Sequence, residues 1–450
     1  MLAVLLCGMI ISVLCGLPQL HPGEWLGTTV GQMLGKKDGR TGREISAFQT
    51  ATAALAGTIG TGNIVGVAAA LSAGGPPAIF WMWVSAAVSM GVSYAENRLG
   101  TQYRIPDGSG GYIGGPMLYI AGGLGMRRLA GAWAAVCVLA SFGVGNTIQV
   151  NAITVSAYNA FGCPRWLSGA LICMLAAPAV LGGVKGTVRL TEKLVPLMAA
   201  GYIAACAAVI VMNIGRVPEA FGMILSGVLR PRAAGSGIFC GMLEGVRRGV
   251  FTNEAGMGSS VMINASADSS DPRAAGCWGM LEVFVDTMIM CTLTALTLIV
   301  SGAYTGAPGN GSKMSAAAFA GVFGKASGAF ISVCLLLFAF STLISWGVTG
   351  ERACRWVLGG GSSAWFRAIY VSAIIPGALL DAGAAWAAAD TINACMLLPN
   401  MASVLMLVLP EGMEKPGSED RTSAARAGPA AGKKEKNMEK SLFKAVPPSL

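Results

Sequence analysis

Long stretches of this 450-residue chain contain no acidic or basic residue. The longest runs from Ile45 to Ala95, and four others cover 129–164, 194–215, 326–350 and 391–410. Each is long enough for at least one helix of roughly 20 residues across a hydrocarbon core about 30 Å thick. Charged residues make up only 12% of the chain and its mean hydropathy is +0.62. The sequence therefore predicts an all-α integral membrane protein rather than a soluble domain.

Apolar runs separated by polar breaks predict about eleven membrane spans. Their approximate bounds are 1–17, 48–72, 77–97, 131–160, 166–183, 194–214, 236–266, 276–302, 326–350, 366–382 and 386–410. If the second span runs outward, most Lys and Arg residues lie in cytoplasmic segments, so we expect the N-terminus outside and the C-terminus inside. The net charge of +9 then reflects this distribution in a bacterial-type plasma (inner) membrane, and no nucleic-acid partner is expected.

Two glycine-rich breaks interrupt the second and seventh predicted spans. They are "GTIGTGNIVG" (Gly57 to Gly66) and "RRGVFTNEAGMGSS" (Arg247 to Ser260). Unwound backbone at this depth is tolerated only where it lines a cavity, and glycine lets a ligand approach bare backbone. A single pattern of this kind is more typical of close helix packing. Two breaks five spans apart instead favour an inverted repeat whose broken helices meet at the middle of the bilayer.

Three further segments complete a pattern that resembles a known family. They are "GNTIQVNAI" (Gly145 to Ile153), "WGMLEVFVDTMIMCTLTALTLIVSG" (Trp278 to Gly302) and "FAFSTLISWGVTGER" (Phe338 to Arg352). With the two breaks and the residues around the first, they resemble the alanine or glycine:cation symporter family from about Gly35 to Pro410. The chain departs from the family pattern at Ala152, where serine is frequent, and in the "GVTGE" that follows Trp346, where tyrosines are usual.

The resemblance implies a leucine-transporter-like fold of the amino acid–polyamine–organocation superfamily, with five-plus-five inverted repeats. We accordingly divide the chain into an extra N-terminal transmembrane helix and loop (1–34), a first repeat (35–215) and a second repeat (216–410). The remaining 411–450 is rich in Lys, Glu, Ala, Gly and Pro, and is expected to be a disordered cytoplasmic tail.

A zwitterionic amino acid can be bound by the ends of broken helices without charged side chains. The backbone N–H groups expected to hold its carboxylate belong to Gly60, Thr61, Gly62 and Asn63. Carbonyls near Phe251 and Thr252 are expected to accept from its ammonium group, and Asn253 and Gly256 are placed in the same site. The resemblance adds Gln149, whose amide both donates and accepts; on residue type alone it is as typical of a helix-packing bridge.

The resemblance also implies a sodium site between two helices. Its ligands would be the carbonyls of Ala56 and Ile59 and the hydroxyls of Ser341 and Thr342. Because those hydroxyls are adjacent, they cannot fully share one helix face, and the alternative is a bond back to their own helix. Trp346, one turn beyond Thr342, is expected to form the floor of the substrate pocket; the alternative is that it only packs between helices. Phe251 is the expected opposing gate.

Carboxylates inside the membrane are costly and need partners. Glu282 and Asp286 lie one helical turn apart and are expected either to pair with Arg247 or Arg248 or to line a cytoplasmic vestibule. Glu254, in the second break, is expected to cap a half-helix or to tether a moving bundle. Asp390, near the outer end of the last span, is expected to be solvated.

Taken together, these features predict a sodium-coupled symporter that imports alanine, glycine or both by alternating access. A proton-coupled transporter of the same fold is the alternative, and a channel is disfavoured because the two breaks are inequivalent. An enzyme is not expected: the only histidine, His21, lies in a predicted loop, and the 12 cysteines lack metal-ligand spacing. We expect no resident cofactor, and the partners are the amino acid, the sodium ion and the lipid bilayer.

Overall fold

The structure, a computed structural model, describes residues 2–34, 47–107, 111–229, 237–267, 271–306, 310–380 and 382–409. The first half contains α1 (Leu2–Leu14), α2 (Pro22–Leu34), α3 (Ala47–Thr58), α4 (Val67–Gly74), α5 (Pro77–Gln102), β1 (Ile105–Pro106), β2 (Tyr112–Ile113), α6 (Pro116–Gly123), α7 (Arg127–Ala140), α8 (Ile148–Phe161), α9 (Arg165–Leu181) and α10 (Gly183–Met212). The second half contains α11 (Val217–Leu229), α13 (Gly237–Asn253), α14 (Ser259–Asn264), α15 (Pro272–Val283), α16 (Thr292–Val300), α17 (Gly311–Phe323), α18 (Ser327–Leu358), α19 (Ser363–Ser372), α20 (Ile374–Leu379) and α21 (Ala382–Val408).

Every predicted span coincides with a helix or with consecutive helices. Six helical stretches in the described residues are long and apolar enough to cross a membrane, or seven when the bent pair α3 and α4 is counted as one span. Shorter apolar helices cover Ala3–Leu14 and Arg165–Leu181. The all-α class is confirmed, while the count of eleven spans and the two repeat boundaries stay predictions. The tail 411–450 lies outside the described residues.

Several helices lie where the sequence predicted only connections. These are α2, α6, α11 and α17, together with the short antiparallel hairpin of β1 and β2. α2 is anchored by the Trp278 indole N–H, which donates to Gln32 Oε1 at 2.7 Å, and by an edge contact between the rings of Trp25 and Phe284. The loop predicted within 1–34 is therefore mostly helix.

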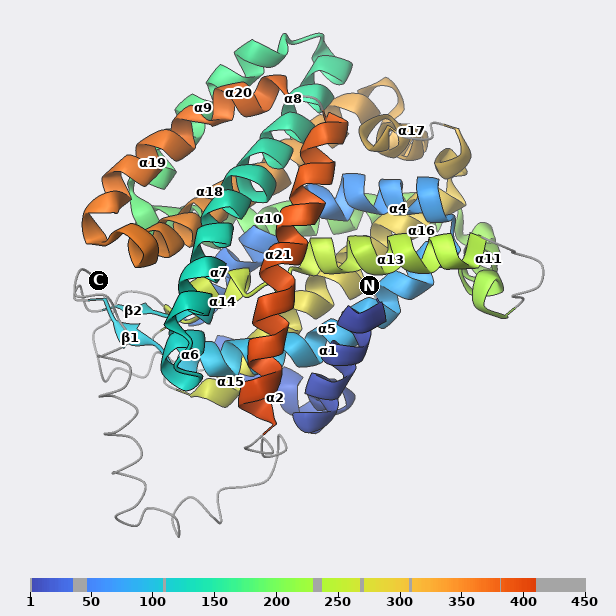
Figure 1. Ribbon diagram of the computed structural model, residues 1–450. Helices are drawn as coiled ribbons and strands as arrows, with labels where there is room; N and C mark the ends of the chain where they lie inside the picture. The colour runs from blue at the N-terminus through green and yellow to red at the C-terminus, as the bar shows by residue number, and fades with distance from the viewer. Residues whose placement is uncertain are drawn as a thin grey trace.

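The two broken helices lie together in the middle of the bundle. At the first break the chain bends by 45° between Ala51–Thr58 and Gly62–Gly74, and α4 then runs beside α13 (Figure 1). α13 also packs closely on α5: a Cβ on Gly245 would lie 2.2 Å from the carbonyl oxygen of Ala78, so only glycine permits this approach. The second break, between α13 and α14, thus lies between the first break and α5.

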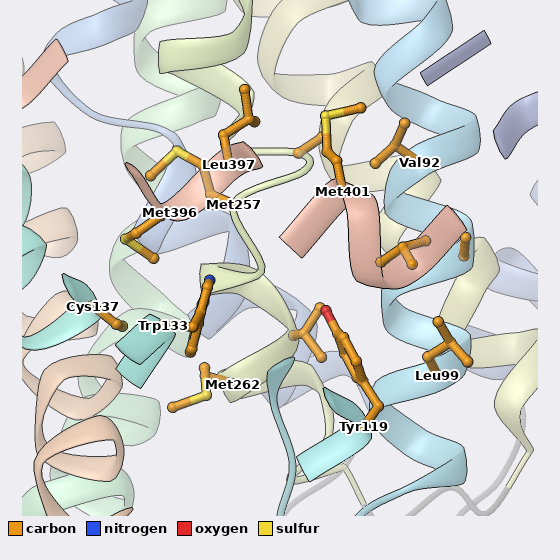
Figure 2. Packing of buried hydrophobic residues seen from close by; sticks show 14 of the residues in the cluster. Val92, Leu99, Tyr119, Trp133, Cys137, Met257, Met262, Met396, Leu397 and Met401 are labelled. Carbon is orange, nitrogen blue, oxygen red and sulfur yellow. The ribbon is translucent and has the colours of Figure 1, made fainter. Parts of the chain in front are cut away.

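A methionine-rich core surrounds the second break. Met257 of the break lies near Met396 of α21, and Met262 of α14 lies near Trp133 of α7 (Figure 2). Methionine is unbranched and fills irregular gaps, so it suits the packing of an irregular backbone segment. α21, which carries Met396, crosses the bundle beside α7 (Figure 1).

Candidate substrate and cation site

Side chains at the first break accept hydrogen bonds from backbone N–H groups that would bond within the helix if it were continuous. Gly60 N–H donates to Asn63 Oδ1 at 2.9 Å, and Thr61 N–H donates to Gln149 Oε1 at 3.3 Å. In an α-helix these two groups would donate to the carbonyls of Ala56 and Gly57. The capping side chains therefore release carbonyl oxygens at the end of α3.

The Ile59 carbonyl is released in the same way, because Asn63 N–H donates instead to the Gly60 carbonyl at 3.3 Å. The Thr342 hydroxyl of α18 lies 3.3 Å from this Ile59 oxygen and also donates to the carbonyl of Phe338 at 3.1 Å. Ala56 and Ile59, both fully buried, are the two residues whose carbonyls were predicted to bind sodium. The break thus frees both predicted oxygens and brings Thr342 to one of them.

Ser341 behaves differently from Thr342. Its hydroxyl donates to the Phe338 carbonyl of its own helix at 2.8 Å, and its second neighbour is the sulfur of Met198 on α10, at 3.8 Å. Among the described residues no hydrogen bond joins Ser341 to α3. One turn further on, the Ser345 hydroxyl donates to the carbonyl of Ala53 at 3.1 Å, a contact between two helices that was not predicted.

Gly60 and Gly62 face the other predicted site residues. A Cβ on Gly60 would lie 2.5 Å from Thr342 Oγ1 and 3.3 Å from Gln149 Oε1. A Cβ on Gly62 would lie 2.7 Å from Thr252 Oγ1 of α13. Bare backbone at these two positions therefore lets α8, α13 and α18 converge on the first break.

The second break releases carbonyls by the same device. Ala255 N–H donates to Asn253 Oδ1 at 3.1 Å, and Gly256 N–H donates to Glu96 Oε2 of α5 at 3.0 Å. In a continuous helix these N–H groups would donate to the carbonyls of Phe251 and Thr252. In the part of the chain that the structure describes, neither carbonyl accepts a hydrogen bond from elsewhere.

Two residues predicted for the substrate site make most of their contacts elsewhere. Gly256 bonds through both backbone groups to Glu96 and Asn400, and its Cα faces α21. Asn253 donates to Thr287 Oγ1 on the stretch that joins α15 and α16, at 3.3 Å. These contacts are typical of residues that fix the shape of the break. Neither Glu96 nor Asn400 was singled out in the sequence, because each lies far along the chain from the segment it holds.

The two aromatic gate candidates also have defined neighbours. The Phe251 ring lies 4.8 Å, centroid to centroid, from the ring of Trp386 on α21. The indole N–H of Trp346 donates to Glu254 Oε1 at 2.9 Å, and Trp346 is only 1% exposed. The expectation that Glu254 tethers parts of the bundle agrees with this bond from the second break to α18.

The buried carboxylates do not pair with Arg247 or Arg248, so that alternative was wrong. Arg247 pairs with Glu244 and Asp390, each at 3.2 Å, and Arg248 lies 3.7 Å from Glu244. Asp390 is therefore held in an ion pair rather than simply solvated. The buried carboxylates bond to amides instead.

Asp286 accepts from Asn63 Nδ2 at 2.7 Å, and Glu282 accepts from Asn264 Nδ2 at 2.8 Å. The amide of Asn63 thereby caps the first break with its oxygen and holds Asp286 with its nitrogen. A single side chain thus joins the first break to the stretch between α15 and α16.

Three π-helical stretches surround this region: Gly62–Gly66, Ser141–Thr147 and Phe284–Cys291. They contain Asn63, the Val144 carbonyl that accepts from Gln149 Nε2 at 3.1 Å, and Asp286. Short π-helical insertions in α-helices are frequent at functional sites. Their clustering on three separate helices marks the same region as the two breaks.

Comparison with known proteins identifies the family. Residues 1–412 match the model of the sodium:alanine symporter family. The chain belongs to this family. The sodium:alanine symporter family consists of transporters rather than enzymes, so the chain is a multi-pass membrane transporter, as predicted.

Its relatives include transporters named for different substrates. It is 37% identical over 407 residues to an uncharacterized transporter of Haemophilus influenzae, covering 89% of this chain and 88% of the relative. It is 37% identical over 373 residues to the sodium/alanine symporter AgcS of Methanococcus maripaludis, covering 81% and 82%. It is 33% identical over 371 residues to the probable sodium/glutamine symporter GlnT of Bacillus subtilis, covering 82% and 77%.

The fold also resembles a solved structure. MhsT in complex with L-phenylalanine superposes with a TM-score of 0.59 at 17% identity, covering 90% of this chain and 97% of that one. At this identity the likeness concerns the fold alone. It supports the leucine-transporter-like architecture that the sequence predicted.

Proposed function

We propose that this member of the sodium:alanine symporter family couples sodium entry to the import of small neutral amino acids, alanine or glycine, by alternating access. The observation that carries the proposal is the release of backbone carbonyls at both breaks by side chains that take the matching N–H groups. Oxygen atoms without donors suit a hard monovalent cation and an ammonium group, and they need no charged side chain.

The cation would bind where α3 ends and α18 passes. The freed carbonyls of Ala56 and Ile59 and the hydroxyl of Thr342 would supply oxygen ligands of the kind that sodium prefers. Ser341 would contribute only after its hydroxyl turns from Phe338 toward α3. Thr342 also lies against Gly60, so one hydroxyl would sense both the cation and the substrate.

The amino acid would bind between the two breaks. Its ammonium group would donate to the freed carbonyls of Phe251 and Thr252. Its carboxylate would replace Gln149 Oε1 at the N–H of Thr61, where the present contact of 3.3 Å is long for a hydrogen bond. Gln149 could then turn its amide N–H₂ toward the same carboxylate.

Size selection would come from the two aromatic residues beside the site. Trp346 lies one helical turn from Thr342, and the ring of Phe251 packs against Trp386. Large rings held in these positions would leave room for a hydrogen or a methyl side chain and would exclude longer ones. This supports alanine and glycine over the larger amino acids named for some relatives.

Uptake into proteoliposomes tests the proposal. Purified protein should accumulate radiolabelled alanine above its external concentration when a sodium gradient points inward, and only equilibrate it when sodium is equal on both sides. Empty liposomes provide the control. Accumulation driven by a proton gradient in the absence of sodium would show that transport is coupled to protons rather than to sodium. Uptake that never exceeds equilibrium under any gradient would indicate a channel.

We also propose a bacterial-type plasma (inner) membrane with the N-terminus outside and the C-terminus in the cytoplasm. The concentration of Lys and Arg in alternate connections supports this orientation. Reporter fusions at the C-terminus, one active only in the cytoplasm and one only outside it, test the orientation directly. Activity of the second fusion alone would reverse it.

A further inference from the structure

Glu254 has an unusual backbone conformation at the second break. Its φ is 55°, in the left-handed region that residues with a Cβ rarely adopt. Its side chain is buried, with 5% exposed, between α13 and α14. Strained residues of this kind persist only where the surrounding structure holds them, and they concentrate at functional segments.

The carboxylate of Glu254 joins two separate elements. Oε2 accepts from the hydroxyl of Ser259, in the first turn of α14, at 2.5 Å, and Oε1 accepts from the indole N–H of Trp346 on α18 at 2.9 Å. No ion pair with a basic side chain accompanies these bonds in the described residues. A carboxylate without a basic partner is costly inside the membrane, so the contacts of its oxygens need a structural or functional reason.

Trp346 is also fixed from its other side. A Cβ on Gly145, in the π-helical stretch Ser141–Thr147, would lie 2.3 Å from Cβ of Trp346 and 2.5 Å from its Cγ. The indole therefore lies directly on the backbone of Gly145 while Glu254 holds its N–H. Only a glycine at 145 leaves room for this position of the ring.

We infer that Glu254 is a positioning residue that sets the place of the Trp346 indole and so the size limit of the substrate pocket. This rests on the proposed function, in which the Trp346 ring forms one wall of that pocket. When the second break changes shape during transport, the carboxylate moves with it and the indole loses its acceptor. The upper limit on the size of the bound amino acid therefore applies in only one conformation of the break.

Three substitutions separate this role from general stability. Glu254→Asn suits a positive φ, but its side chain is one methylene shorter and cannot keep both contacts. Glu254→Gln keeps the length and an acceptor oxygen. Trp346→Phe keeps an aromatic ring and removes the N–H donor. Glu282→Gln, at a buried carboxylate whose Oε1 accepts from Asn264 of α14, is the matched control, because an amide keeps that acceptor oxygen.

The first measurement is the ratio of the inhibition constants of valine and alanine against radiolabelled alanine binding. Glu254→Asn and Trp346→Phe should each lower this ratio at least threefold. The double variant should lower it no further, because both changes remove one interaction. Glu254→Gln and Glu282→Gln should stay within twofold of wild type. A wild-type ratio in Glu254→Asn, or an additive double variant, would overturn the inference.

The second measurement does not depend on the substrate. In protein labelled with 5-fluorotryptophan, the ¹⁹F resonance lost in Trp346→Phe identifies residue 346. That resonance should shift in Glu254→Asn and stay in place in Glu282→Gln. An unmoved resonance would overturn the inference even if alanine were not the substrate. If the resonance shifts in Glu254→Asn as expected but the wild-type protein does not bind alanine, the result would count against the proposed function and not against this inference.

Discussion

Replacing Gly60 by alanine tests the convergence of the candidate cation and substrate sites. The new Cβ would lie 2.5 Å from Thr342 Oγ1 and 3.3 Å from Gln149 Oε1. Ordinary van der Waals contact begins at 3.4 Å, so the hydroxyl must move by roughly 1 Å. Its contact with the Ile59 carbonyl, already 3.3 Å long, cannot survive that movement.

The magnitude follows from the contact that is lost. A hydrogen bond in a folded protein contributes about 1 kcal/mol net, and crowding in a packed interior costs about 1–3 kcal/mol more. Part of the crowding is relieved by rotation of Thr342, so we expect a loss of about 1.5–3 kcal/mol in alanine binding. This corresponds to an affinity roughly 10- to 150-fold weaker, with a parallel rise in the sodium concentration for half-maximal binding.

Gly57→Ala is the matched control, because it lies on the same helix end. Its Cβ would meet the Cβ of Ser345 at 3.7 Å, an ordinary contact, and its alanine affinity should stay within twofold of wild type. Binding is measured with radiolabelled alanine on detergent-purified protein at several sodium concentrations, and folding is followed by thermal unfolding. A folded Gly60→Ala protein with wild-type affinity and sodium dependence would refute the reasoning.

Three further substitutions test the site, each by equilibrium alanine binding. Gln149→Ala removes the amide N–H₂ proposed to donate to the substrate carboxylate and should weaken binding by about 1–3 kcal/mol; an effect on protein yield alone would mean that Gln149 only bridges helices. Thr342→Ala should weaken sodium and alanine binding together, since coupling is reciprocal, and a normal sodium dependence would move the cation site elsewhere. Gly62→Leu should abolish binding in a folded protein, because its Cβ alone lies 2.7 Å from the Thr252 hydroxyl; unchanged affinity would exclude this break as the carboxylate site.

The spans and both breaks could be predicted because each leaves a local signal. Long uncharged runs mark the spans, and glycine beside Asn63 or around Glu254 marks a helix that cannot continue. The helices α2, α6, α11 and α17 lacked such a signal, since they are shorter than a span and were hidden among polar connections.

Contacts between distant segments were beyond the sequence. Nothing in the spacing of Glu96 shows that its carboxylate reaches the backbone of Gly256, 160 residues away. Likewise Asp286 was expected to pair with an arginine, because opposite charges can be recognised in a sequence. Its partner Asn63 has an uncharged amide, which gives no such indication. Which side chains of two neighbouring helices meet depends on how each helix is rotated about its own axis, and a hydropathy pattern does not give that rotation.

A π-helical stretch holds one residue more than the regular turns it replaces. Deleting one residue from Phe284–Cys291 would restore a regular helix and leave α15 and α16 in their present orientations. The same deletion elsewhere in a span would rotate every later side chain by about 100°. Single-codon losses and gains at the three π-helical stretches are thus an evolutionary route by which relatives can reshape the lining of the site while keeping their helices intact.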